Sequence, residues 1–162
     1  MNIGPRGFSI IKQFEGLHLK AYKCVAGFAT IGYGHLIRKN EDYLLSEEIT
    51  EVIADTLLKV DISVSERSVK RLISPALTRG QYDALVSFTF NLGGGSLQIS
   101  TLRSMINRGD IIEAADQFPR WIWAGGRKWK GLILRRSKER LLFLDTNYET
   151  ETIELPEGYN NG

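Results

Sequence analysis

Apolar residues recur at helical spacing near the start of the chain. Phe8, Ile11 and Glu15 fall on one face of such a helix, three and then four residues apart. A proline precedes the pattern, and Gly16 follows it directly as a plausible helix stop. The pattern therefore predicts a short helix over residues 8–14 that ends at Gly16.

The pattern changes over residues 21–36, where β-branched and aromatic residues are interrupted by glycines. Short apolar runs broken by glycine are typical of strands joined by tight turns. This segment predicts a small, strongly turned antiparallel sheet. The residues that favour strands are Tyr22, Val25, Phe28, Thr30, Ile31 and Tyr33, and the glycines are Gly27, Gly32 and Gly34.

A long helix is predicted next, over residues 46–73. Ser46 is a candidate N-cap, and two acidic residues follow it in the expected first turn. An apolar stripe runs along the segment, and Pro75 ends it. We expect this helix to join a small N-terminal lobe to a larger C-terminal lobe. The stripe consists of Ile49, Ile53, Leu57 and Val60.

The rest of the chain predicts several short helices over residues 78–144, followed by a polar tail. Breaks fall at the glycines 93–95, Gly109, Pro119 and the glycines 125–126. After Asp145 the sequence is acidic, with Glu149, Glu151, Glu154 and Glu157, and we expect a loose extension there.

These elements predict one α+β domain spanning residues 1–162. We expect an N-terminal lobe with a short antiparallel sheet over about residues 1–45. A linking helix is expected over about 46–73, a mostly helical C-terminal lobe over about 75–145, and the tail over 146–162.

Composition narrows the class of protein. Of 162 residues, 43% are hydrophobic and 25% are charged, and the net charge of +2 does not argue for nucleic-acid binding. Cys24 is the single cysteine, so no internal disulfide can form, which suits a reducing cytosol. No stretch resembles a signal peptide or approaches the roughly 20 apolar residues of a membrane span. Two histidines and one cysteine make a poor set of metal ligands, so we expect no metal and no cofactor.

Three residues near the predicted sheet are candidates for acid–base chemistry. Glu15 would end the first helix, where the helix dipole and the neighbouring Phe14 both favour a protonated carboxyl group and a raised pKa. Such an acid can protonate a leaving alkoxide. Cys24 and Thr30 would lie on neighbouring strands of a hairpin that turns near Gly27, where two polar groups can hold a water molecule. Spacing alone is weak evidence, because each residue type also has an ordinary structural use.

A family resemblance strengthens this interpretation. Eight residues separate Glu15 from Cys24, and five separate Cys24 from Thr30, which begins the run Thr-Ile-Gly-Tyr-Gly-His. This arrangement resembles the active-site signature of the phage lysozymes, glycoside hydrolase family 24, whose T-even phage members are the familiar ones. Two later segments resemble the same family, namely residues 90–95 with Ser100-Thr101-Leu102, and residues 131–143. The matches appear in family order and cover nearly the whole chain apart from the tail.

The resemblance implies a lysozyme-like fold and an endolysin that hydrolyses the β-1,4 bond between N-acetylmuramic acid and N-acetylglucosamine in peptidoglycan. It implies that Glu15 is the general acid and that Cys24 and Thr30 manage the attacking water. The best-known members carry Asp where this chain has Cys24. The thiol can therefore act as a base, position water or serve as a nucleophile, and it is either natural or an engineered replacement.

Further substrate contacts are expected at His35, Asn91, Ser100, Thr101 and Arg135. Each has a structural alternative: a hydrogen-bonded histidine, helix capping and turn chemistry, or an ion pair between Arg135 and Glu139 on a surface helix. The family's paired arginines suggest that one of them reaches the active site. For Trp121, Trp123 and Trp129 we favour core positions over sugar stacking, and for the basic run 127–130 a solvated surface.

Two other functions compete with hydrolysis. A lytic transglycosylase needs an acid but no water-activating partner, and Thr30 at the family spacing argues against it. A non-catalytic wall or membrane binder would act through the basic helix around residues 135–140. We expect a monomer with no nucleic-acid partner and no stable membrane insertion. The resemblance implies that it stays in the host cytoplasm until a holin releases it to the cell wall.

Overall fold

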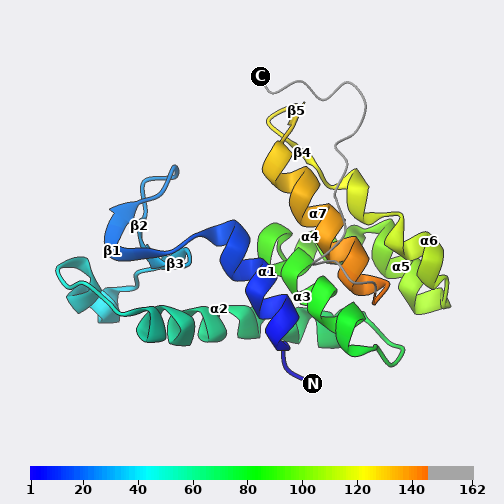
Figure 1. The fold of residues 1–162 in the computed structure, drawn as a ribbon, viewed down its shortest axis with the longest axis horizontal. Helices are drawn as coiled ribbons and strands as arrows, with labels where there is room; N and C mark the ends of the chain where they lie inside the picture. Colours follow the sequence, from blue (N-terminus) through cyan, green and yellow to red (C-terminus); the bar gives the residue numbers. More distant parts are fainter. Residues whose placement is uncertain (146–162) are drawn as a thin grey trace. The chain divides into compact units, whose positions relative to one another are not determined.

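The computed structural model describes residues 1–145, and the predicted tail, residues 146–162, lies outside them. The described chain forms two compact units, traced in Figure 1. The smaller unit is Ile11–Val64. The larger unit joins Met1–Ile10 to the chain from Ser65 onward. The chain crosses between the units inside two helices, α1 (Pro5–Glu15) and α2 (Glu51–Leu72).

The smaller unit contains the predicted antiparallel sheet. Its strands β1 (His18–Lys23), β2 (Ala29–Gly32) and β3 (His35–Leu36) are hydrogen-bonded in the order β1-β2-β3. The sheet begins three residues earlier than predicted, at His18. Its core is built from apolar side chains of the sheet, both helices and the segment that joins the sheet to α2. The residues almost fully buried there are Ile11, Ile31, Leu44, Ile49, Ala54 and Leu58.

The end of α1 agrees with the glycine signal in the sequence. Gly16 has a φ of +73°, a left-handed conformation in which glycine carries no steric cost. Its N–H donates to the carbonyl of Lys12 at 3.1 Å. The helix starts at Pro5, three residues before the predicted start, because the fixed φ of proline suits a first helical position.

The start of α2 corrects the prediction. A 3₁₀ helix, η1 (Lys39–Leu45), comes first, and α2 begins at Glu51. Thr50 is the N-cap in place of Ser46, because its hydroxyl accepts the N–H of Ile53 at 3.3 Å. The N–H of Ile49 donates to the carbonyl of Leu19 at 2.9 Å. This bond ties the preceding segment to β1 and delays the helix.

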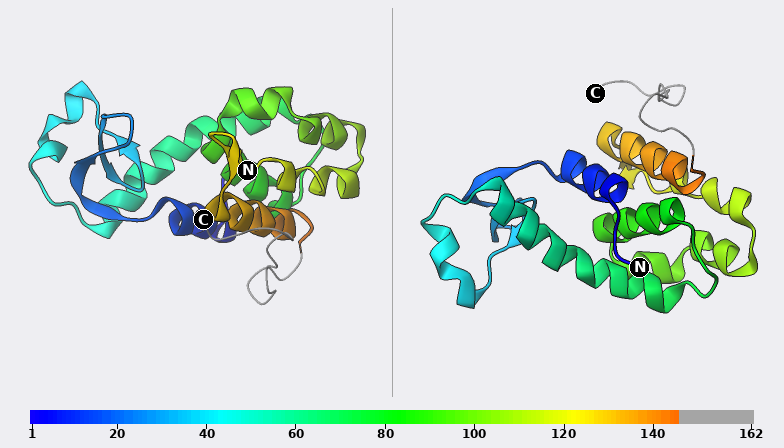
Figure 2. Two further views of the ribbon diagram at one scale, coloured as in Figure 1. Left: turned by 90° about the horizontal axis from the view of Figure 1, so that it is seen from above. Right: turned by 60° about the horizontal axis from the view of Figure 1, so that its bottom comes forward.

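The larger unit is mostly helical, and its core lies around α3 (Arg79–Leu92) and α7 (Lys130–Phe143), which pack against each other (Figure 2). Gly93 breaks the chain as predicted, with a φ of +86°, whereas Gly94 and Gly95 already belong to the next helix. The intervening elements are α4 (Gly94–Ile99), α5 (Thr101–Arg108), α6 (Ile111–Ala115) and the 3₁₀ helix η2 (Phe118–Arg120).

A short hairpin interrupts the region predicted to be helical. Strands β4 (Trp123–Ala124) and β5 (Arg127–Lys128) pair antiparallel across the turn at Gly125 and Gly126, whose φ angles are +57° and +77°. The expectation of core tryptophans is wrong for two of the three. Trp123 is 58% exposed and Trp129 is 43% exposed, because the hairpin lies outside the helical packing. Trp121 is half-buried, edge-on to Phe88.

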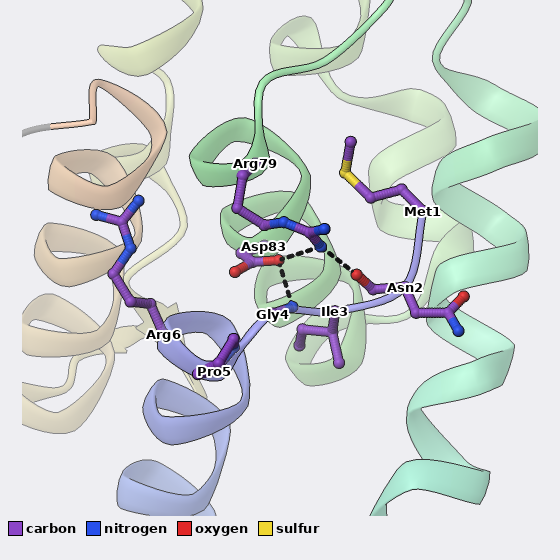
Figure 3. Close-up of a pocket in the computed structure, with 8 residues that line it drawn as sticks. All are labelled: Met1, Asn2, Ile3, Gly4, Pro5, Arg6, Arg79 and Asp83. Carbon is purple, nitrogen blue, oxygen red and sulfur yellow. Dashed lines mark hydrogen bonds and ion pairs between the residues drawn. The ribbon is translucent and has the colours of Figure 1, made fainter.

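The first residues of the chain are anchored by a buried carboxylate on α3, shown in Figure 3. Asp83 is 1% exposed and accepts the N–H of Gly4 at 2.8 Å and that of Gly7 at 3.3 Å. A Cβ added to Gly7 would lie 2.7 Å from the Cβ of Asp83, so only glycine permits this approach. Burial raises the pKa of Asp83 even though both N–H groups favour its charged form. Asp83 thus caps the N-terminus of α1 from another helix.

No helix within residues 1–145 has the length and apolar character needed to cross a membrane. The same residues contain no group of three or more His, Cys, Asp or Glu side chains arranged to hold a metal ion.

Candidate active site

Glu15 is the last residue of α1, and the helix turn that carries it is fixed within the smaller unit. Ile11 is fully buried, and Lys12 reaches two carboxylates of α2, Asp55 at 2.8 Å and Glu51 at 3.0 Å. The hydrogen bond to Asp55 raises the pKa of Lys12, so the ammonium stays charged. These contacts position the half-buried Glu15 side chain.

The Glu15 carboxylate lies beside the turn between β2 and β3. Its Oε2 atom is 3.9 Å from the place that a Cβ on Gly34 would occupy. Gly34 has a φ of +89°, and its lack of a side chain leaves the space next to the carboxylate open. The helix end and the sheet turn therefore meet at this acid.

Cys24 and Thr30 are brought together at the other turn of the same sheet. The Cys24 N–H donates to the Phe28 carbonyl at 2.9 Å, and the Gly27 N–H donates to the Cys24 carbonyl at 2.8 Å. Cys24 directly follows β1, and Thr30 lies on β2 opposite Tyr22. The Thr30 hydroxyl is buried and donates to the Phe28 carbonyl at 3.0 Å.

The turn around Cys24 favours a thiolate. A backbone hydrogen bond from Phe28 is the main cause that lowers the pKa of the Cys24 thiol, opposed by some desolvation. The amides of Ala26 and Gly27 and the Thr30 hydroxyl act in the same direction. The single Thr30 proton can serve either the Phe28 carbonyl or the Cys24 sulfur, so the two side chains are coupled.

His35 is held inside the smaller unit by two carboxylates. It is 2% exposed, with Nδ1 2.8 Å from Asp61 and Nε2 3.0 Å from Glu41. Burial lowers the pKa of His35, but the hydrogen bonds to Glu41 and Asp61 outweigh burial, and the pKa is raised. Both ring nitrogens are occupied, so the contacts favour the structural alternative over sugar binding.

The remaining predicted contacts lie in the larger unit, and three of them are engaged in its structure. Ser100 is the N-cap of α5, where it accepts the Arg103 N–H at 3.0 Å and donates to the Leu97 carbonyl at 2.8 Å. Asn91 accepts from Arg136 at 2.9 Å. Thr101, the first residue of α5, is exposed.

Arg135 belongs to a buried ionic cluster. It is 3% exposed and contacts Glu139 at 3.2 Å and the Ser87 carbonyl at 3.3 Å. Arg136 pairs with the same carboxylate at 2.8 Å, and the Ser87 hydroxyl donates to it at 2.7 Å. The predicted pair of Arg135 and Glu139 exists, but the expected surface helix is wrong because both side chains are buried. These contacts do not favour a role for Arg135 in binding substrate.

The family model described as phage lysozyme matches residues 12–139 of the chain. The chain belongs to the phage lysozyme family. It is 42% identical to an endolysin of Bacillus phage B103 over 146 residues, covering 89% of this chain and 54% of that protein. This member therefore spans about half the length of that relative.

Two solved structures resemble this phage lysozyme family member closely. A P22 lysozyme variant has a TM-score of 0.82 at 35% identity, covering 89% of this chain and 99% of the other. The muramidase domain of SpmX from Asticaccaulis excentricus has a TM-score of 0.78 at 35% identity, covering 88% and 97%. These likenesses confirm the predicted lysozyme-like α+β fold.

The sequence did not point to the residues that hold the candidate site of this family member in place. Lys12 lies one helix turn before Glu15, which is a local signal, but its partner Glu51 lies 39 residues further along the chain. Asp61, which holds His35, lies 26 residues beyond it. Pairings at such distances are set by packing, which a single sequence does not reveal.

The lowered pKa of Cys24 leads to a prediction for thiol chemistry. We expect alkylation of native Cys24 by iodoacetamide to reach half its maximal rate at a lower pH than alkylation of the urea-unfolded chain. Thr30→Val removes one hydroxyl donor and should move the native midpoint toward the unfolded one, whereas Thr30→Ser should retain it. Rates measured against pH on the single thiol test this. Coincident native and unfolded midpoints would contradict the assigned hydrogen bonds.

Proposed function

We propose that this chain is a phage endolysin that hydrolyses peptidoglycan as a muramidase. It would cleave the β-1,4 bond between N-acetylmuramic acid and N-acetylglucosamine, as a member of glycoside hydrolase family 24. One observation carries the proposal: Glu15 ends its helix against the Gly34 turn, in the same compact unit as the coupled Cys24–Thr30 pair. The names endolysin, lysozyme and muramidase among its relatives support it.

Glu15 is the proposed general acid. Its carboxyl proton passes to the glycosidic oxygen as the bond from that oxygen to the anomeric carbon breaks, and the leaving sugar departs as an alcohol. The fixed helix turn and the open space at Gly34 support this role, because an acid must be held where a bulky leaving group can approach it.

Cys24 and Thr30 are the proposed partners of the attacking water. The Thr30 hydroxyl orients the water, and the Cys24 thiolate accepts its proton as the water oxygen bonds to the anomeric carbon. The lowered pKa of the thiol supports this role, since it raises the thiolate population at neutral pH. The product would be a reducing sugar with inverted configuration.

The wider setting is proposed on the same basis. We infer that the protein works as a monomer on peptidoglycan strands without a cofactor, and that it stays in the host cytoplasm until a holin lets it reach the wall. Sugar contacts by Asn91 and Thr101 remain part of the proposal. For His35, Ser100 and Arg135 the contacts described above favour structural roles.

Analysis of digested cell wall tests the proposed reaction. We expect mass spectrometry to find reducing N-acetylmuramic acid ends, each heavier by one water than a 1,6-anhydro end. We also expect NMR of fresh product to show the inverted anomer. Anhydro ends would indicate a transglycosylase. Retained configuration would make Cys24 a nucleophile instead of a partner of water.

A further inference from the structure

The β4–β5 hairpin and the residues that follow it form an exposed surface in the larger unit. We call the side chains of Trp123, Arg127, Lys128, Trp129 and Lys130 the hairpin surface. All five residues are exposed, and Figure 1 shows the hairpin leading directly into α7. Two large exposed tryptophans in one short segment need an explanation, because such residues usually lose contact with water on folding.

Hydrogen bonds made by Trp129 give the hairpin surface a defined conformation. The Trp129 indole N–H donates to the Ala124 carbonyl at 2.8 Å, and the Trp129 backbone N–H donates to the Ile122 carbonyl at 3.1 Å. These bonds close the segment across the Gly125–Gly126 turn. The Trp129 ring is therefore held in place on the surface.

The charge of this surface is of one sign. Residues 120–131 contain four basic residues, namely Arg120, Arg127, Lys128 and Lys130, and no acidic residue. The whole chain carries a net charge of only +2. Positive charge is thus concentrated at the hairpin, which favours a negatively charged partner.

The positions of the cations over the rings distinguish among such partners. The Arg127 guanidinium lies 4.1 Å from the centroid of the Trp129 ring, and the Lys128 ammonium lies 5.3 Å from that of Trp123. A sugar that stacked on these faces would have to displace the cations that cover them. A soluble polyanion would pair with the cations but gain little from the indoles. A bilayer surface interacts favourably with both the indoles and the cations, because tryptophan favours the headgroup level and basic residues favour anionic lipid.

We propose that the hairpin surface docks the protein reversibly on bilayers that contain anionic phospholipid. Trp123 and Trp129 enter the headgroup region, while Arg127, Lys128 and Lys130 pair with lipid phosphates. This contact is peripheral and crosses no membrane. It goes beyond the proposed hydrolysis and does not depend on it, because neither Glu15 nor the Cys24–Thr30 pair takes part.

Vesicle binding tests the proposal. We expect the full chain to co-sediment with phosphatidylcholine vesicles containing about a third phosphatidylglycerol, with blue-shifted tryptophan fluorescence, and not with pure phosphatidylcholine. Arg127→Gln/Lys128→Gln should weaken the partition coefficient roughly 10- to 30-fold. Trp123→Ala should weaken it several-fold and reduce the blue shift. Hydrolysis of soluble wall fragments should stay unchanged in these variants, which checks their folding.

The matched control removes the same charge elsewhere in the larger unit. Lys70→Gln/Arg71→Gln changes two exposed basic residues in the last turn of α2. An equal loss of binding in this control would overturn the proposal, because net charge would then explain the attraction. Binding without a blue shift that is matched by soluble polyglycerol phosphate would also overturn it in favour of an anionic polymer.

Discussion

Replacing Glu15 by Gln should abolish wall lysis while leaving the fold intact. Glutamine matches the shape of the carboxyl group but carries no acidic proton for the glycosidic oxygen. We expect a loss of roughly 10²–10⁴-fold in turnover, the range for removing a positioned acid. Turbidity loss of a wall suspension and release of reducing ends measure this effect. Unchanged circular dichroism and thermal midpoint should accompany it.

A matched control for this substitution lies in the same compact unit. Glu47 is exposed in the segment before α2, so Glu47→Gln removes one negative charge without touching the site. We expect this control to lyse walls at the normal rate. Full activity in Glu15→Gln, or an equal loss in both variants, would remove Glu15 from the mechanism.

The largest loss of stability is expected from Glu139→Ala. The Glu139 carboxylate is fully buried and pairs with Arg135 at 3.2 Å and with Arg136 at 2.8 Å. The Arg136 side chain is fully buried as well, and this burial lowers its pKa. Removing the shared acceptor leaves two buried cations together, and breaking such a pair costs about 3–5 kcal/mol. Urea unfolding followed by circular dichroism measures the change in free energy.

An exposed ion pair in the same unit serves as the reference. Arg140 Nη2 lies 2.7 Å from Asp116 Oδ1, and the Asp116 side chain is 59% exposed. Because water screens this pair, Asp116→Ala should cost less than about 1 kcal/mol. If Glu139→Ala costs no more than this reference, the buried cluster is not the stabilising feature that its contacts indicate.

Local signals in the sequence predicted the elements whose ends are set locally. Gly16 ends α1 and Gly93 ends α3, because the chain has a positive φ at each place, which favours glycine. The sheet followed from its glycines and β-branched residues. The predicted start of α2 at Ser46 was wrong because a hydrogen bond between Ile49 and Leu19, which are distant in sequence, competes with the local N-cap signal of Ser46. The hairpin at residues 123–128 was not predicted because its strands are only two residues long, too short for a recognisable alternating pattern.

The candidate site was predictable only where the spacing of residues carried the information. Glu15, Cys24 and Thr30 fall within one compact unit, and the helix end and hairpin expected for them are present. The direction of side chains was not predictable. Arg135 points into a buried cluster, and His35 lies between Asp61 and Glu41, because partners from other elements decide where long polar side chains go.

The Asp83 anchor sets which parts of the N-terminal segment tolerate change. Asp83 accepts hydrogen bonds from backbone amides, so the side chains of the first two residues can vary without loss of the cap. An affinity tag fused before them should also leave the cap intact. Gly4 and Gly7 have no such freedom, since an added methyl group at either would collide with Asp83. Natural or designed substitutions at this end of the molecule should therefore retain Gly4, Gly7 and Asp83, while the residues around them can change.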